Sequence, residues 1–255
     1  MRDIQSEHDG RGVAVDRVGI SGLRYPLTFT DGELRQEGIA DLEVTVQLQA
    51  DRRGTHMSRM VEIVHNHLTE LDPRRLPIVL KAAAHHLDAP ALTVSASLPI
   101  STLVAAPATK APAWQVHDLN ISGVLEPDSV RVTTTVSSEV TSLCPCSKAI
   151  SEYGAHNQRS RVTLAAIGDG DAPYPIPVTE LIELVRSNGS APVYPLVKRP
   201  DERHITMQAF DHPAFVEDMA RELSLACRRR GVAHRVEVRN FESIHSHDAI
   251  ATITA

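Results

Sequence analysis

The stretch LEVTVQLQADRRGTHMSRMVEIVHNHL, residues 42–68, decides the fold because its hydrophobic period changes partway along. Apolar and polar residues alternate over 42–48, which is typical of a half-buried strand. After a polar turn at 52–56, apolar residues recur over 57–71 at the three- and four-residue spacing of an amphipathic helix. A strand followed directly by a helix is therefore the first unit of the architecture.

The rest of the first half extends this pattern. Asp72 and Pro73 are typical of a helix N-cap and first-turn proline, and they predict a second helix that ends near Asp88. Alternation over 92–98 predicts another strand. We expect the Pro- and Ala-rich stretch 99–112 to be a long loop, and 114–124 to return to extended structure.

The second half repeats this order. Strands are expected at 130–140, 159–166, 232–238 and 250–254, with helices at 179–186 and after Asp211 and Pro213. Two short segments, Gly54–Arg59 and Gly154–Arg159, also resemble each other weakly, and this local echo favours a duplication. We expect a duplicated α+β unit in which two helices cover an antiparallel sheet, with residues 1–14 as a frayed tail and units at 15–125 and 126–255. Open sheet edges predict association of subunits.

Composition narrows the function. The formal net charge is −6 and the pI about 6.1, which argues against a nucleic-acid-binding protein. No apolar run is long enough to span a bilayer, and residues 1–13 lack the apolar middle of a signal peptide, so no membrane partner is expected. Three cysteines without a disulfide framework favour a reducing cytoplasm.

The segment TSLCPCSKAISEYGAHNQRS, residues 141–160, carries most of the candidate chemistry. In a continuous strand Cys144 and Cys146 would share one side, but Pro145 should end the strand, so we expect one thiol to face a site and the other to pack. Free cysteines are often small buried hydrophobes, but nearby cations favour a reactive or ligating thiol. His156, among small neighbours, suits a metal ligand or a proton shuttle, although a turn histidine is the plainer alternative.

A second cluster, ESIHSHD at 242–248, places two histidines at strand spacing. His245 and His247 would share one side if the segment is extended, and with a thiolate they would suit Zn²⁺ or another first-row divalent ion. Glu242 or Asp248 would then fix an imidazole tautomer from the outer shell.

Charged residues elsewhere have ordinary explanations beside the functional ones. We expect Lys198–Arg203 to be a solvated charge run in a loop, although its cations and acids would also suit an anionic substrate and a metal. Glu217 lies early in a predicted helix, where an acid complements the macrodipole.

With these motifs the chain resembles the GTP cyclohydrolase type IB family. The resemblance covers most of the chain and rests on separate motifs in one order: RGTHMSR (53–59), SLCPCSK (142–148), SEYGAHNQRS (151–160), YPLVKRPDE (194–202), FVEDMAR (215–221) and NFESIHSHDA (240–249). It implies the tunnelling fold, a ββααββ unit duplicated in one chain and assembled as a homotetramer. It also implies conversion of GTP to 7,8-dihydroneopterin triphosphate and formate, which opens folate biosynthesis.

The resemblance implies roles for individual residues. Cys144, Glu202 and His247 would hold one divalent metal (Zn²⁺, Mn²⁺ or Fe²⁺), with His245 as the competitor of His247. His156 would be a fourth ligand or a catalytic group, and Glu217 would anchor the guanine edge. For the triphosphate, Lys148 and Arg159 are the candidate cations. One departure is Met207-Gln208, where the family often carries an acid.

Two other functions compete with this one. A tunnelling-fold nitrile reductase would use Cys146 as a covalent nucleophile and NADPH as hydride donor. A non-catalytic metal- or nucleotide-binding protein would hold a structural ion in a closed four-ligand site. The role of the first-half motif at 53–59 stays open, with structural support for a neighbouring site as the default.

Overall fold

The computed structural model describes residues 3–255 and shows an α+β protein, as predicted. Its strands join in the hydrogen-bonded order β10-β9-β7-β6-β5-β4-β2-β1-β3, with β8 paired to β6. Contacts divide the chain into two compact units. Unit 1 comprises Met1–Leu98, Asn120–Thr134 and Ile167–Pro175, and unit 2 comprises Pro99–Leu119, Thr135–Ala166 and Ile176–Ala255.

Four long strands each contribute to both units, namely β4 (Leu92–Ala105), β5 (Pro112–Glu126), β6 (Ser129–Leu143) and β7 (Asn157–Asp169). The division by contacts therefore cuts across strands. The duplicated repeats along the chain are a different partition: their proposed boundary at 125/126 falls at the end of β5, before the turn into β6. Those repeat boundaries stay a prediction.

Unit 1 adds β1 (Val15–Thr30), β2 (Arg35–Leu48), β3 (Glu70–Leu71), α1 (Met57–Ile63) and α2 (Leu76–Leu87). A π-helical turn, Val64–Leu68, and a 3-10 turn, Pro73–Arg75, connect them. The alternating residues of β2 bury Leu42, Val44 and Val46, as their period predicts. Gly123 lets α2 approach β5, since a Cβ there would lie 2.8 Å from the side chains of Leu76 and Leu80.

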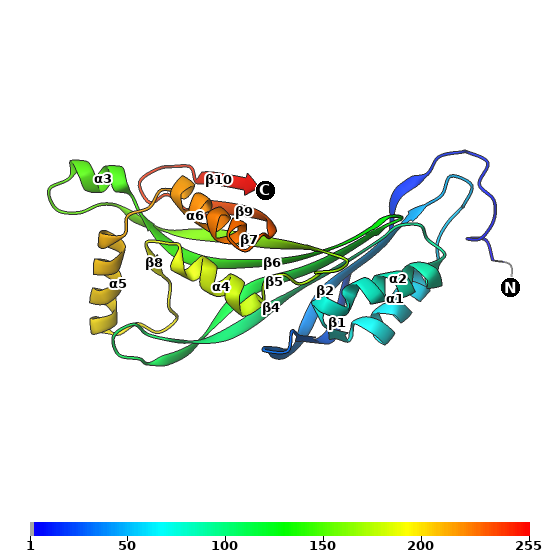
Figure 1. Cartoon of the computed structure of the whole chain (residues 1–255), viewed down its shortest axis with the longest axis horizontal. Coiled ribbons are helices and arrows are strands. Elements are labelled where there is room, and N and C mark those ends of the chain that lie inside the picture. The colour runs from blue at the N-terminus through cyan, green and yellow to red at the C-terminus, as the bar shows by residue number, and fades with distance from the viewer. Residues whose placement is uncertain (1–2) are drawn as a thin grey trace. The chain divides into compact units, whose positions relative to one another are not determined.

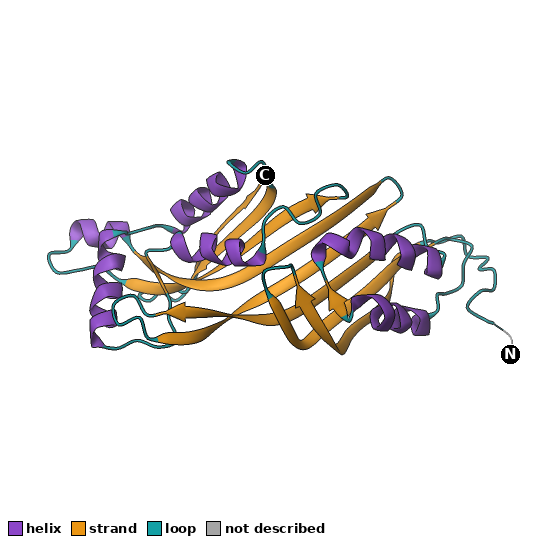
Figure 2. Ribbon diagram, turned by 60° about the horizontal axis from the view of Figure 1, so that its bottom comes forward, coloured by secondary structure: helices purple, strands orange, loops and turns teal. Residues whose placement is uncertain are grey.

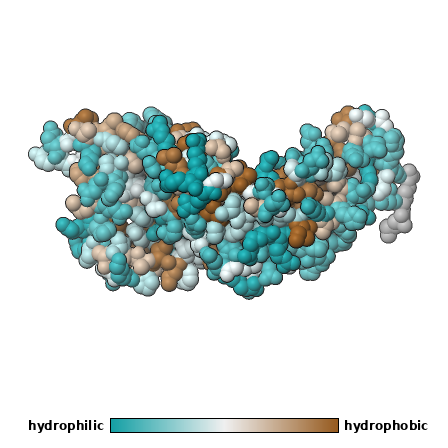
Figure 3. Space-filling view, in the orientation of Figure 1, coloured by the Kyte–Doolittle hydropathy of each residue, from teal (hydrophilic) through white to brown (hydrophobic). Residues whose placement is uncertain are grey.

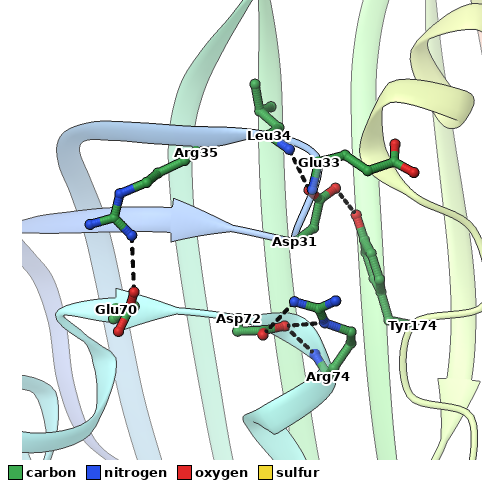
Figure 4. Close-up of polar contacts among 8 residues, drawn as sticks. All are labelled: Asp31, Glu33, Leu34, Arg35, Glu70, Asp72, Arg74 and Tyr174. Carbon is green, nitrogen blue, oxygen red and sulfur yellow. Dashed lines mark hydrogen bonds and ion pairs between the residues drawn. The ribbon is translucent and has the colours of Figure 1, made fainter.

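Several polar contacts surround the β1–β2 turn of unit 1 (Figure 4). The carboxylate of Asp31, 5% exposed, accepts hydrogen bonds from the backbone N–H of Leu34 at 2.7 Å and from the Tyr174 hydroxyl at 2.7 Å. Asp72 caps the 3-10 turn and holds the Arg74 guanidinium at 2.7 and 2.9 Å. Because Asp31 is bonded to both segments, it ties the β1–β2 turn to the loop that precedes Ile176.

Unit 2 adds α3 (Pro145–Ile150), α4 (Val178–Ser187), β8 (Ala191–Pro192), α5 (Arg199–Asp211), α6 (Val216–Arg228), β9 (Ala233–Asn240) and β10 (Ala249–Thr254). α6 packs on β9, β10 and α4, and Figures 1 and 2 show α4 and α6 covering one face of the strands. α5 packs through a small cluster in which Ala209 and Ile205 meet Leu143 and Ala191. Across residues 3–255, no helix is long and apolar enough to cross a membrane.

His117 on β5 gives unit 2 a pH-dependent stability. It is 2% exposed, its ring nitrogens bond to the hydroxyls of Thr102 and Ser138, and burial, with Arg186 nearby, lowers its pKa from 6.5 to about 4. Between those values the unfolded chain binds a proton that the folded chain excludes, so stability falls as pH drops from 6.5 towards 4.

We expect this histidine to cost about 2 kcal/mol of the free energy of unfolding at pH 5 relative to pH 8. Urea denaturation of the wild type and His117→Gln at both values measures it, because acid-sensitive groups common to the two proteins cancel. An equal loss in both proteins would contradict the prediction.

Three local predictions were wrong. Residues 99–105 continue β4 instead of forming a loop, because pairing of β4 with β2 ends at Ser97 and the missing N–H of Pro99 falls beyond it. Residues 199–203 are the first turn of α5 and not a loop. Segment 5–9, expected to fray, makes backbone hydrogen bonds to residues 51–54, while Met1 and Arg2 lie outside the described residues.

The local echo between 54–59 and 154–159 has no structural counterpart. His56 is the N-cap of α1, which follows the second strand of its repeat. His156 precedes β7, between the first two strands of the other. The two histidines therefore occupy different topological positions. The first half has the predicted order of two strands, helices and two strands, and the second half adds the short helix α3 between its first two strands.

Candidate functional site

One pocket of unit 2, with a volume of about 270 Å³, collects most of the predicted site. It is lined by residues at the end of β6, the start of β7, the start of α6 and the β9–β10 connection. The predicted residues that line it are Cys144, His156, Glu217, His245 and His247. Glu242, suggested from the sequence as an outer-shell acid, lines it as well, and so does Gln158, which the sequence did not single out.

Cys144 lies at the junction of β6 and α3. Its backbone N–H donates to the His156 carbonyl at 3.0 Å, and its Sγ accepts from the backbone N–H of Ser147 at 3.4 Å as the N-cap of α3. The predicted end of the strand at Pro145 is confirmed, because β6 ends at Leu143 and Pro145 begins α3. Cys146 is exposed and does not line the pocket.

His156 is half-buried beside Cys144. Its Nδ1 donates to Oε1 of Gln158 at 2.8 Å, while Oε2 of Glu242 is 3.9 Å away. This leaves Nε2 as the ring nitrogen available to a ligand or a proton. The ring of His245 meets that of His156 edge to face, with 6.4 Å between the ring centroids.

His245 and His247 lie in an irregular connection rather than in a strand. Their rings nevertheless stack, with centroids 5.1 Å apart and planes 21° from parallel, and both residues are exposed. Stacking keeps both imidazoles at the same pocket, so the structure brings the two competitors together without choosing between them.

Buried polar residues behind the pocket hold its segments in place. Ser160 donates to Oδ1 of Asn240 at 2.6 Å, Asn240 donates to Ser142 at 3.0 Å, and Ser142 donates to the Ala214 carbonyl at 2.8 Å. This chain links β7, β9, β6 and the residue that leads into α6. Sequence reasoning missed it: the three residues stand at the ends of the motifs at 142–148, 151–160 and 240–249, but nothing in the sequence shows that they bond to one another.

Glu217 reaches the pocket from the first turn of α6. The helix begins after Phe215, whose backbone N–H donates to the Asp218 carboxylate at 3.0 Å. Val216, Met219 and Ala220 are buried, which leaves Glu217 exposed at the pocket wall. An exposed carboxylate beside a half-buried thiol and an imidazole can accept hydrogen bonds from a ligand without being desolvated beforehand.

Three predicted residues lie outside this pocket. Glu202 is exposed on α5 and does not line it. Lys148 donates to the Phe210 carbonyl and lies over the Phe210 ring, with Nζ 4.2 Å from the ring centroid. Arg159 is exposed on β7, and its guanidinium contacts the Glu139 carboxylate at 3.2 Å.

The buried carboxylate of Asp201 fixes the start of α5. It accepts hydrogen bonds from the backbone N–H groups of Ala108 and Thr109, both at 2.8 Å, from the Thr109 hydroxyl at 2.6 Å and from the Lys198 N–H at 3.1 Å. These hydrogen bonds outweigh burial and hold the pKa of Asp201 well below its usual range. Pro200 in the first turn and an acid at the third position were the sequence signals for this helix.

The donor types at the pocket fit a first-row metal. One thiol and three imidazoles are ligands that zinc and its neighbours accept. Within the described chain, however, no three His, Cys, Asp or Glu side chains stand close enough together to hold an ion as they are. The chemistry of the donor set therefore supports a metal, and the side chains would have to converge on it.

Comparison with known proteins gives one family. A family model described as type I GTP cyclohydrolase folE2 matches residues 1–251. A GTP cyclohydrolase FolE2 from Methylococcus capsulatus is 42% identical over 257 residues, which cover 98% of this chain and 93% of the relative. Another from Fervidobacterium nodosum is 36% identical over 258 residues, covering 100% and 97% of the two chains.

A solved structure supports the fold alone. A uricase from Bacillus fastidious superposes with a TM-score of 0.51 at 10% identity, covering 97% of this chain and 94% of its own. Uricases are tunnelling-fold proteins, so the predicted fold class is confirmed. With the family model spanning almost the whole sequence, the chain belongs to the type I GTP cyclohydrolase family, in its FolE2 group.

Proposed function

We propose that this chain converts GTP and water into 7,8-dihydroneopterin triphosphate and formate, the first step of tetrahydrofolate biosynthesis. Family membership supports the reaction. The observation that carries it structurally is the convergence of Cys144, His156, Glu217 and the His245/His247 pair on one pocket. These residues are far apart in sequence, and together they offer metal ligands, a proton carrier and a purine anchor.

A divalent metal, Zn²⁺, Mn²⁺ or Fe²⁺, would supply Lewis acidity for hydration of the imidazole ring of the substrate. Cys144 and His156 would hold it with one or both of His245 and His247. Glu202 stays in this proposal as a ligand that α5 would have to carry to the pocket. The ligating thiol must stay reduced, and all three cysteines are free, so we infer a reducing compartment such as the cytoplasm.

Glu217 would bind the guanine edge. Its two carboxylate oxygens would accept hydrogen bonds from the ring N–H and the exocyclic amine, which guanine presents side by side. Adenine lacks this pair of donors, so the same carboxylate would exclude it. This contact would also set how far the imidazole ring of the substrate reaches towards Cys144 and His156.

His156 would take and return protons at Nε2. Because Nδ1–H is bonded to Gln158, the free lone pair is on Nε2, which would face the substrate. Proton transfer to the ring nitrogens of the substrate would assist ring opening and departure of formate. The proposal has two forms: Nε2 of His156 either ligates the metal or only carries protons.

A homotetramer would complete the site. The pocket volume of about 270 Å³ falls below the roughly 300–1,000 Å³ of pockets that enclose whole ligands, so GTP needs further walls. Leu103, Trp114 and Val116 are more than 60% exposed, and hydrophobic patches reach the surface drawn in Figure 3. Lys148 and Arg159 would contribute charge to the triphosphate at such a subunit boundary.

A turnover assay tests this function. The protein is reconstituted with Zn²⁺, Mn²⁺ or Fe²⁺, and formate release and oxidised neopterin fluorescence are followed with and without a chelator. We expect both products in equal amounts, lost on chelation while circular dichroism is unchanged. Folded, metal-loaded protein that makes neither product would overturn the proposal, and unfolding on chelation would favour a structural ion.

A further inference from the structure

We propose that Gln158 is a positioning residue for the metal centre and acts through His156. Its amide oxygen would hold Nδ1–H of His156, which directs the Nε2 lone pair into the pocket. The inference rests on the proposed function, since it assigns a role toward the metal that function requires. Neither the Cys-Pro-Cys motif nor the His-x-His motif includes this residue.

Two contacts and the burial of Gln158 carry the inference. The Gln158 side chain accepts from His156 Nδ1 at 2.8 Å, and its Oε1 also accepts from the Ser243 hydroxyl at 3.4 Å. Gln158 is only 7% exposed, so its amide is shielded from water that would compete for these bonds. Ser243 belongs to the connection that carries His245 and His247, so one amide joins β7 to both histidine segments.

The sequence suggested Glu242 or Asp248 for fixing the tautomer of a ligating histidine, but neither carboxylate is positioned to hold His156 Nδ1–H. Oε2 of Glu242 lies 3.9 Å from His156 Nδ1, beyond hydrogen-bond distance. Asp248 is engaged by the Arg239 guanidinium at 3.3 Å. A metal-ligating histidine almost always donates its second N–H to an oxygen, and substitution of that partner costs metal affinity. Here the oxygen belongs to a neutral amide, which orients the ring without adding charge.

Metal affinity tests the proposal independently of turnover. Co²⁺ binding by competition with a chromophoric chelator should weaken about 10–100-fold in Gln158→Leu, which keeps the volume but removes the acceptor. Gln115→Leu is the matched control. Gln115 is a 9% exposed glutamine in the same unit, it bonds to Arg186 and it does not line the pocket. We expect wild-type Co²⁺ affinity there.

A double-mutant cycle separates positioning from packing. If Gln158 acts through His156, Gln158→Leu should weaken Co²⁺ binding no further in a His156→Ala background. Wild-type affinity in folded Gln158→Leu, or an undiminished loss in the His156→Ala background, would overturn the proposal. If Gln158→Leu does not fold, Gln158→Asn replaces it, because the shorter side chain draws the amide oxygen back from Nδ1. We expect the same weakening of Co²⁺ binding in that variant. Wild-type protein that binds no divalent ion would instead sink the proposed function.

Discussion

Cys144→Ala will lose the divalent metal and GTP turnover together while the protein stays folded. Cys144 supplies the one thiolate among the proposed ligands, and it is half-buried beside His156. We expect metal affinity to fall by more than about 100-fold, the upper limit for substitutions outside the ligand shell. If the metal contributes about 4 kcal/mol to the transition state, turnover falls roughly 10³-fold.

Cys146→Ala is the matched control for that variant. Cys146 lies two residues away on α3, is exposed and does not line the pocket. Metal content by atomic emission and formate release should match the wild type. Cys144→Ala also removes the α3 N-cap, which costs about 1 kcal/mol at most sites, so thermal melting should shift only slightly. Full turnover by metal-free Cys144→Ala would remove this cysteine from the site.

Opposite effects in the two cysteine variants would favour another chemistry. If Cys146→Ala abolished activity and Cys144→Ala did not, the covalent nucleophile of a nitrile reductase would account for the result better than a metal ligand does. The exposed position of Cys146 outside the pocket is the observation against that outcome.

Periodicity predicted the parts of the fold that hydrophobic burial determines. Alternation in 42–48 and helical spacing after Met57 became β2 and α1 because each pattern has one face to bury. α5 escaped this reasoning, since only Asp201 and Ala209 of its residues are buried and its charges are typical of a loop. It begins where it does because Asp201 collects N–H groups from residues 108 and 109, about ninety positions away.

The candidate site, like the fold, could be predicted from the sequence only in part. Motifs predicted six of the residues that line the pocket, counting Glu242 as an outer-shell acid, because metal and purine chemistry limits the residue types that serve it. Gln158 was missed although it lies two residues after His156, a spacing that places both on one side of an extended chain. Glu202 was selected by its motif, yet its helix places it outside the pocket, a position set by tertiary contacts that no local pattern encodes.

The Glu217→Ala variant will retain the metal but will lose its ability to bind GTP. Hydrogen bonds to a charged group contribute about 1.5–3 kcal/mol each, so removal of two should lower kcat/KM by roughly 10²–10⁴-fold. Glu222→Ala is the control, since Glu222 is exposed on the same helix, α6, and does not line the pocket. Metal content and circular dichroism should be unchanged in both, and calorimetry should detect GTP binding only in the control. Normal GTP binding by Glu217→Ala would disprove the anchor.

Glu217→Gln gives a sharper version of the same test, because it changes which purine fits. The amide keeps one acceptor for the ring N–H but presents N–H groups to the exocyclic amine of guanine, where two donors would face each other. Inosine triphosphate lacks that amine and avoids the clash. We therefore expect the preference for GTP over inosine triphosphate, measured as a ratio of kcat/KM, to shrink by at least about tenfold, which corresponds to roughly 1.4 kcal/mol. An unchanged ratio with lower activity for both nucleotides would mean that Glu217 supports α6 or the metal and does not recognise guanine.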